Sequence, residues 1–129
     1  MLKISAESRF LHVEATGDFS LAEAQRTFLE MLEAVEQHRA EKVLFDGRAL
    51  KGNPKTMERF FYGEFAAQQV VKSIFRGGPA PTFAYLLQAP VLDRGRFGET
   101  VAVNRGMSVK TFDNVKDALE WLGIPPAKA

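Results

Sequence analysis

Cysteine is absent from this chain of 129 residues, and histidine occurs only twice. The lack of cysteine excludes disulfide bonds, thiolate zinc ligands and cysteine nucleophiles. The two histidines, His12 and His38, do not stand in a metal-ligand motif such as HExxH. The serines lack the GxSxG and SxxK contexts of nucleophilic serines. We therefore predict no catalytic residues, no metal site and no bound cofactor.

The sequence also lacks a long apolar run and an excess of charge of one sign. No segment approaches the roughly 18 apolar residues of a membrane span, and residues 1–7 lack the apolar core of a signal peptide. We therefore expect a cytoplasmic protein without a membrane span. The 17 basic and 16 acidic residues leave a net charge of +1. Because a nucleic-acid binder needs an excess of basic groups, we predict no nucleic-acid partner.

What the chain does have is the composition of a globular domain. Hydrophobic residues make up 46% of it and charged residues 26%, and 11 residues are phenylalanine. The length lies within the commonest range for one domain, and this apolar content is enough for a sizeable core. We predict a single domain over residues 1–129.

Strands and helices alternate along the chain after an opening pair of strands. Alternating apolar and polar residues indicate strands, apolar residues at helical spacing indicate helices, and glycine and proline mark the breaks. The predicted strands are residues 2–5, 9–16, 42–46, 82–87 and 107–112, with a turn at Glu7-Ser8. The predicted helices are residues 21–38, 54–75, 93–104 and 114–122. This order, ββαβαβαβα, predicts an α/β fold in which helices pack against a mixed β-sheet of about five strands.

Capping residues support several of these boundaries. Ser20, with Glu23 three residues later, forms a capping box at the start of the first helix. Asn53 and Pro54 are typical of an N-cap and a first helical residue, and Asp113 is typical of the N-cap of the last helix.

The last third of the chain carries a family resemblance. It contains the segment Phe97-Gly98-Glu99-Thr100-Val101-Ala102-Val103-Asn104-Arg105-Gly106, then Phe112-Asp113 and Ala118-Leu119-Glu120-Trp121-Leu122. This part resembles the C-terminal half of the small bacterial SpoIIAA-like proteins. They are a branch of the STAS superfamily that overlaps the Sec14-like lipid-binding folds. The resemblance implies a STAS-like fold and no particular reaction.

The loop predicted after the third strand departs from one pattern of that family. In anti-sigma-factor-antagonist STAS proteins a strand here ends in Asp, and a phosphorylatable Ser follows two residues later at a helix start. Asp46 matches the Asp, Gly47 follows, and Arg48 stands at the position of the Ser. An arginine cannot accept phosphate from a Ser/Thr kinase, so the resemblance implies no phospho-switch. Two interpretations remain: Arg48 attracts an anion, or Asp46 caps a turn and Arg48 is solvated.

The second predicted helix has an unusual distribution of apolar residues. At 100° per residue, its apolar face comprises Met57, Phe60, Phe61, Ala67, Val71, Ile74 and Phe75. Glu64 and Gln68 fall inside this face, whereas Tyr62 and Phe65 fall outside it. An unpaired carboxylate is costly to bury. Either the helix bends at Gly63 and the face is core, or the face lines a cavity or a partner surface.

Two arginines open the third predicted helix. Arg94 and Arg96 lie close to a helix N-terminus, and both helix N-termini and arginine clusters attract anions. The alternative is that they pair with Asp93 and Glu99 on a solvated surface.

These observations lead to two functional hypotheses. The first is a non-enzymatic interaction domain that binds a protein partner or forms a homodimer. The second is a Sec14-like binder of a small apolar or anionic amphipathic ligand, such as a lipid. The residues predicted to contact the partner or ligand are Phe61, Tyr62, Glu64, Phe65, Gln68, Arg94 and Arg96.

Overall fold

The computed structural model describes residues 2–7 and 10–125. Within them the elements follow the order ββαβαβαβα that the sequence predicts. The strands are β1 (Leu2–Ala6), β2 (Leu11–Asp18), β3 (Lys42–Lys51), β4 (Thr82–Leu86) and β5 (Ser108–Phe112). The helices are α1 (Leu21–His38), α2 (Thr56–Phe75), α3 (Phe97–Asn104) and α4 (Val115–Leu122). The predicted Glu7-Ser8 turn and the start of the second predicted strand fall partly outside the described residues.

The strands form one five-stranded sheet in the order β1-β2-β3-β4-β5. β1 and β2 are antiparallel neighbours, and each of the next three pairings is parallel. The sheet is therefore mixed, as predicted. Parallel neighbours need a crossover connection, and α1, α2 and α3 supply these connections in turn.

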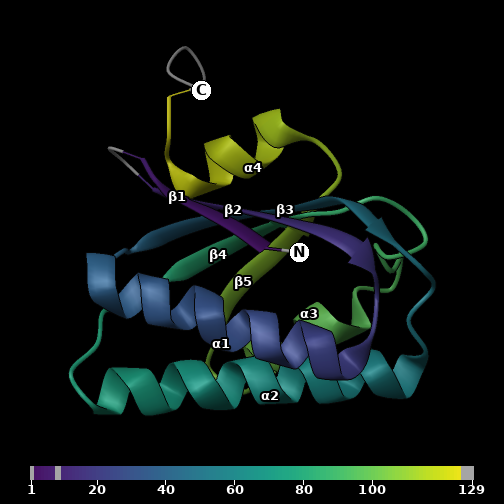
Figure 1. The fold of residues 1–129 in the computed structure, drawn as a ribbon, viewed down its shortest axis with the longest axis horizontal. Helices are drawn as coiled ribbons and strands as arrows, with labels where there is room; N and C mark the ends of the chain where they lie inside the picture. The colour runs from purple at the N-terminus through teal and green to yellow at the C-terminus, as the bar shows by residue number, and fades with distance from the viewer. Residues whose placement is uncertain (1, 8–9, 126–129) are drawn as a thin grey trace.

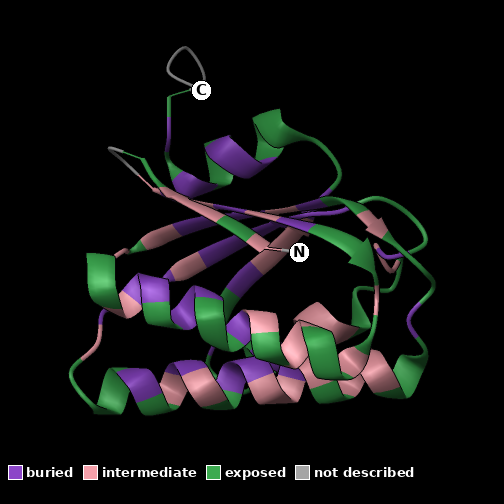
Figure 2. Cartoon of the chain, in the orientation of Figure 1, coloured by how far each residue is buried: buried purple, intermediate pink, exposed green. Residues whose placement is uncertain are grey.

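The helices form a layer on each side of the sheet. Figure 1 shows α4 on one side and α1, α2 and α3 on the other. Residues of β3, β4 and β5 enter two separate cores, because successive side chains of a strand point to opposite faces. The larger core joins the sheet to α1 and α2, and the smaller one joins it to α4. In Figure 2 the buried residues accordingly gather on the sheet and on the sides of the helices that face it.

The helix caps confirm some predictions and correct others. Ser20 caps α1, because its Oγ accepts a hydrogen bond of 3.1 Å from the Glu23 amide. The Glu23 carboxylate pairs with Arg26, so among the described residues only the Ser20 half of the predicted capping box is observed. Asn114, not Asp113, caps α4, since its side chain accepts from the Asp117 amide at 2.9 Å.

Two predicted helix starts are too early. α2 begins at Thr56 with Lys55 as its N-cap, whose amide donates to the Glu58 carboxylate at 2.7 Å. Residues 53–54 therefore precede the helix. α3 begins at Phe97, because residues 93–96 form a turn in which the Arg96 amide donates to the Asp93 carbonyl at 3.0 Å.

The third strand is longer than predicted. β3 continues past Asp46 to Lys51, where the sequence predicted a loop. The cause is tertiary: residues 49–51 pair with residues 16–18 of β2 after a register shift. This irregularity lets the strand continue through a segment with no continuous apolar pattern.

The face of α2 that meets the core also differs from the prediction. Its buried residues are Gly63, Ala66, Ala67, Val70 and Ser73. Most of the predicted apolar face lies outward instead: Met57, Phe61, Ile74 and Phe75 are exposed, Phe75 at 87%. α2 turns its small residues inward because α3 packs closely against it, as the Gly63–Gly98 contact shows.

Candidate functional site

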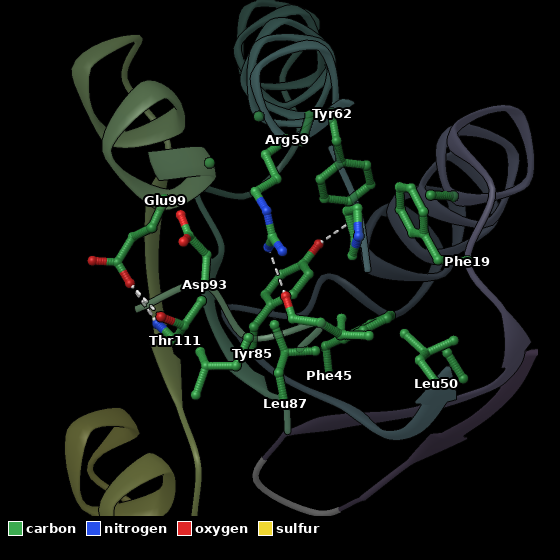
Figure 3. Close-up of a pocket in the computed structure, with 18 of the residues that line it drawn as sticks. Phe19, Phe45, Leu50, Arg59, Tyr62, Tyr85, Leu87, Asp93, Glu99 and Thr111 are labelled. Atoms are coloured by element: carbon green, nitrogen blue, oxygen red, sulfur yellow. Dashed lines mark hydrogen bonds between the residues drawn. The ribbon is translucent and has the colours of Figure 1, made fainter. Parts of the chain in front are cut away.

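A pocket of about 160 Å³ opens between the sheet and the helices that cover it. It lies between the start of α1, the first half of α2, α3 and the sheet, and it reaches the carboxyl ends of β3 and β4. Figure 3 shows labelled side chains of α2, of the sheet and of the segment before α1 around one space. Its lining is mainly apolar, and the aromatic and aliphatic side chains in it include Phe19, Phe45, Leu50, Leu87 and Val91.

Two tyrosine hydroxyls form the main polar group in this apolar lining. Tyr62 of α2 and Tyr85 of β4 both line the pocket, and their hydroxyl oxygens are 2.6 Å apart. The Tyr85 ring stacks on Phe45 with a centroid distance of 4.5 Å, and the Tyr62 ring meets Phe28 edge-on at 6.1 Å. Burial raises the pKa of both tyrosine hydroxyls above the ordinary value of 10. Both side chains are therefore neutral across the physiological range.

Arg59 fixes one wall of the pocket. Its Nη1 donates to the Val91 carbonyl at 2.7 Å, and its Nη2 donates to the Pro90 carbonyl at 2.9 Å. The segment that follows β4 is thus tied to the first half of α2. Figure 3 shows this side chain reaching from α2 into the space beside Tyr85.

Asp93 organises the start of α3. Its carboxylate accepts hydrogen bonds from the Phe97 amide at 2.8 Å and the Gly95 amide at 3.3 Å. These backbone bonds, together with the positive charge of Arg59, hold the pKa of the Asp93 carboxyl below its usual range. The amides at the N-terminus of α3 therefore already have an anion that belongs to the chain itself.

The two arginines predicted to bind an anion differ in their relation to the pocket. The side chains of Arg94 and Arg96 are exposed, and only Arg96 lines the pocket. In the described part of the chain neither forms an ion pair, so the predicted pairing with Asp93 and Glu99 is not observed. Glu99 instead accepts hydrogen bonds from the Thr111 amide at 2.7 Å and from its hydroxyl at 2.8 Å.

The predicted residues of α2 divide between the inside and the outside. Tyr62 lines the pocket, and Phe65 packs on Phe28 with a ring distance of 6.5 Å. Both pack against the core and do not form a separate outer side of α2, so their placement on the helix was wrong. Their contact with a ligand or partner stays a prediction. Glu64 faces outward, where it pairs with Arg105 at 3.5 Å, and Gln68 is exposed.

Phe61 belongs to a cluster on the outer surface, which we call the outer aromatic patch. The patch consists of Met57, Phe60, Phe61 and Phe97. The Phe60 ring lies 5.6 Å from that of Phe61 and 6.3 Å from that of Phe97, and the Arg105 guanidinium lies 5.4 Å above it. Met57, Phe61 and Phe97 are 57%, 43% and 38% exposed. The patch therefore joins α2 to α3 at the surface.

The segment compared with the STAS phosphorylation loop is part of a strand here. Arg48 forms an ion pair of 2.9 Å with Asp46. Partial burial raises the pKa of Asp46, but the hydrogen bonds from Arg48 outweigh this effect and the pKa is lowered. The Asp46 carboxylate also accepts a hydrogen bond of 3.1 Å from the Arg48 backbone amide, as the capping interpretation predicts, although the segment is strand and not turn. Arg48 is paired with Asp46, so this geometry does not favour a free anion site at Arg48. A side chain at Gly47 would stand 2.8–2.9 Å from Leu87, Leu50 and Phe45, so Gly47 leaves room for three side chains that line the pocket.

Part of the pocket lining was predictable from the sequence. Phe45, Tyr85 and Leu87 occupy alternate positions on the face of the sheet that meets α1 and α2, and alternation is readable from sequence. Arg59 carried no such signal, because its partners are backbone carbonyls more than 30 residues away.

Two further observations concern classes of site. Among residues 2–7 and 10–125, no three histidine, aspartate or glutamate side chains are placed to hold a metal ion together. No helix in the same part of the chain is long and apolar enough to cross a bilayer.

Comparison with solved structures identifies the fold. An anti-sigma factor antagonist from Mycobacterium paratuberculosis superposes with a TM-score of 0.58 at 11% identity, over 95% of this chain and 93% of that one. An uncharacterized protein with a SpoIIAA-like fold from Shewanella loihica superposes with a TM-score of 0.51 at 17% identity, over 95% and 92%. No family model and no curated protein sequence matches the chain. The chain thus has the SpoIIAA-like, or STAS-like, fold that its last third predicted.

Proposed function

We propose that this chain is a non-enzymatic, STAS-like binding domain that holds a small, mainly apolar ligand between its helices and its sheet. The observation that carries this proposal is the pocket itself, a space of about 160 Å³ with an aromatic and aliphatic lining and a few convergent polar groups. Small-molecule sites in proteins have this character. We propose that it acts in the cytoplasm, as its sequence predicts.

The chemistry of the lining supports binding rather than catalysis. A nucleophile or a general base needs a pKa near the working pH or an adjacent activating group. The two tyrosine hydroxyls have raised pKa values and bond to each other. The carboxylates of Asp93 and Glu99 accept from backbone amides. His12 and His38 do not line the pocket.

The proposal is tested by filling the pocket from one side. Ala24 of α1 lines it and is partly exposed, so leucine at this position extends into the space without entering the deep core. Binding of toluene, followed by ligand-observed NMR, should occur with the wild type and be lost in Ala24→Leu. Ala22→Leu is the matched control, because Ala22 is exposed on the same helix and does not line the pocket. Absence of toluene binding to the wild type at millimolar concentration would refute the proposal.

A second candidate function is recruitment of a protein, either a partner or a second copy of the chain. The observation that favours it is the outer aromatic patch, because clustered exposed apolar side chains often mark an interface. Glu64 and Arg105 carry opposite charges beside the patch. A surface that carries both positive and negative charge can be complementary to a second copy of itself across a two-fold axis. The solved protein of the same fold from Mycobacterium paratuberculosis is an anti-sigma factor antagonist, which supports a protein partner by analogy.

Self-association by this surface is tested with Phe61→Ser/Phe97→Ser. Sedimentation velocity of the wild type over a range of concentrations should reveal a dimer that this variant weakens. Phe75→Ser is the matched control, since Phe75 is more exposed and lies at the opposite end of α2. Equal weakening by the control, or a wild type that stays monomeric at 100 μM or so, would argue against the patch as a dimer interface.

A further inference from the structure

We infer that the ligand of the pocket is an uncharged molecule about the size of a single ring, with one hydrogen-bond acceptor that meets the hydroxyl pair of Tyr62 and Tyr85. This inference rests on the proposed function and adds the chemical class of the ligand. Three observations carry it: the volume of the pocket, the hydrogen-bond count at the two tyrosines, and the distribution of charge around the lining.

The volume limits the ligand to about one ring. The pocket measures about 160 Å³. An engineered protein cavity of about 150 Å³ lined by apolar side chains holds one benzene molecule. A lipid with two acyl chains is several times larger than this space. The pocket thus encloses a small aromatic or short aliphatic molecule, whereas most of a membrane lipid would remain outside it.

The hydrogen-bond count at the tyrosines leaves one donor for an acceptor on the ligand. Two neutral phenol groups carry two hydroxyl hydrogens, and the bond of 2.6 Å between Tyr62 and Tyr85 uses one of them. Among the described residues no other acceptor for either hydroxyl is observed. The raised pKa values keep both hydrogens in place. One O–H donor in the pocket lining is thus available to a carbonyl, ether or hydroxyl oxygen of the ligand.

The charge around the lining disfavours an anion. Four carboxylates line the pocket, those of Asp18, Glu23, Asp93 and Glu99, against the guanidinium groups of Arg59 and Arg96. Arg59 is already bonded to two carbonyls and lies close enough to Asp93 to lower its pKa. Glu23 is already paired with Arg26, so three carboxylates and two guanidinium groups remain. A ligand carboxylate or phosphate would still meet more negative than positive groups. An uncharged ligand avoids this repulsion and the cost of burying a charge.

The experiment compares three ligands of similar shape: phenol, toluene and benzoate. Their dissociation constants are measured by NMR titration with the wild type and with Tyr62→Phe/Tyr85→Phe. The double variant removes both hydroxyls and keeps both rings, so it leaves no unpaired hydroxyl and should fold normally. Single variants are unsuitable as the main test, because each leaves one hydroxyl still able to bond the ligand.

We expect the double variant to bind phenol about five-fold more weakly than the wild type, because one hydrogen bond is lost. Its affinity for toluene should be unchanged or higher. Benzoate should bind the wild type on the order of ten-fold more weakly than phenol. In the wild type, nuclear Overhauser contacts should place the phenol ring beside the rings of Tyr62 and Tyr85. This last measurement does not depend on the variant.

Each other outcome separates the inference from the proposed function. If phenol and toluene respond equally to the double substitution, or if benzoate binds the wild type most tightly, the inference is wrong while the pocket remains a ligand site. If the contacts place phenol away from the two tyrosines, the inference is wrong as well. If none of the three ligands binds, both the inference and the proposed function are wrong.

Discussion

A methyl group on Gly63 of α2 would stand 2.5 Å from the carbonyl oxygen of Gly98 in α3. The two helices therefore touch through backbone at this point, and both glycines line the pocket. The contact explains why a glycine lies in the middle of a long helix, where it costs about 0.5–1 kcal/mol relative to alanine. The approach of α3 sets the position of one pocket wall.

Gly63→Ala should therefore destabilise the protein even though alanine favours a helix. Overpacking against a backbone oxygen costs about 1–3 kcal/mol, which exceeds the helix-propensity gain of about 0.5–1 kcal/mol. The free energy of unfolding in urea should fall by about 1 kcal/mol or more. Gly98→Ala is the matched comparison, with a nearest contact of 3.2 Å to the Arg59 carbonyl, and it should cost less. A Gly63→Ala variant as stable as the wild type would show that α3 moves away freely.

The tyrosine pair should show strong coupling in stability. Tyr62→Phe or Tyr85→Phe alone leaves one buried hydroxyl without its partner, which costs about 1–3 kcal/mol. The double variant should lie close to the wild type, because both hydroxyls are gone and the rings remain. A double-mutant cycle in urea measures the difference. Additive effects of the two single substitutions would mean that the hydrogen bond contributes little.

Arg59→Gln should loosen the segment that follows β4. The two bonds from its guanidinium to the Val91 and Pro90 carbonyls are lost, which we expect to cost about 1–2 kcal/mol. Amide hydrogen exchange should accelerate for residues 87–92 and stay unchanged in β2. Arg105→Gln is the control, since Arg105 is exposed on the outer surface. If exchange of residues 87–92 is equally slow in the Arg59→Gln and Arg105→Gln variants, packing alone keeps this segment rigid.

Asp93 should contribute stability that depends on pH. Its pKa is lowered in the folded state, so the stabilisation is present above the ordinary value of 3.8. It is lost as pH falls below that value through the folded pKa, because the proton then weakens the bonds from the Phe97 and Gly95 amides. NMR titration should give Asp93 a pKa below 3.8. The stability of Asp93→Asn should fall less steeply than that of the wild type between about pH 4 and pH 2. Parallel curves would assign the acid sensitivity to other carboxylates.

The order of elements was predictable because it depends on local patterns. Turn residues, caps and alternation act over a few positions, and the chain contains clear examples such as Ser20 at the start of α1. Gly106 and Gly123 follow α3 and α4 and adopt positive φ angles, as glycines at helix C-termini often do. These signals were sufficient for the mixed sheet, whereas the STAS-like fold was predicted from the resemblance of the last third to SpoIIAA-like proteins.

The inward face of α2 was not predictable from periodicity. Large apolar residues occur on several sides of this helix, so the pattern does not select one side. The side of α2 with the smallest residues faces inward, because Gly63, Ala66 and Ala67 allow the closest approach of neighbouring elements. Tyr62 and Phe65 then point toward Phe28, and Phe61 points outward.

The sequence by itself thus determined the elements, their order and the absence of cysteine chemistry. It did so because local propensity and composition do not depend on distant partners. Tertiary structure alone decided that β3 continues to Lys51, that Arg59 reaches the carbonyls after β4, and that Tyr62 meets Tyr85. Each of these depends on a group far away in the chain, either a strand partner, a carbonyl or a hydroxyl. The pocket is made by such contacts, so only the folded arrangement defines it.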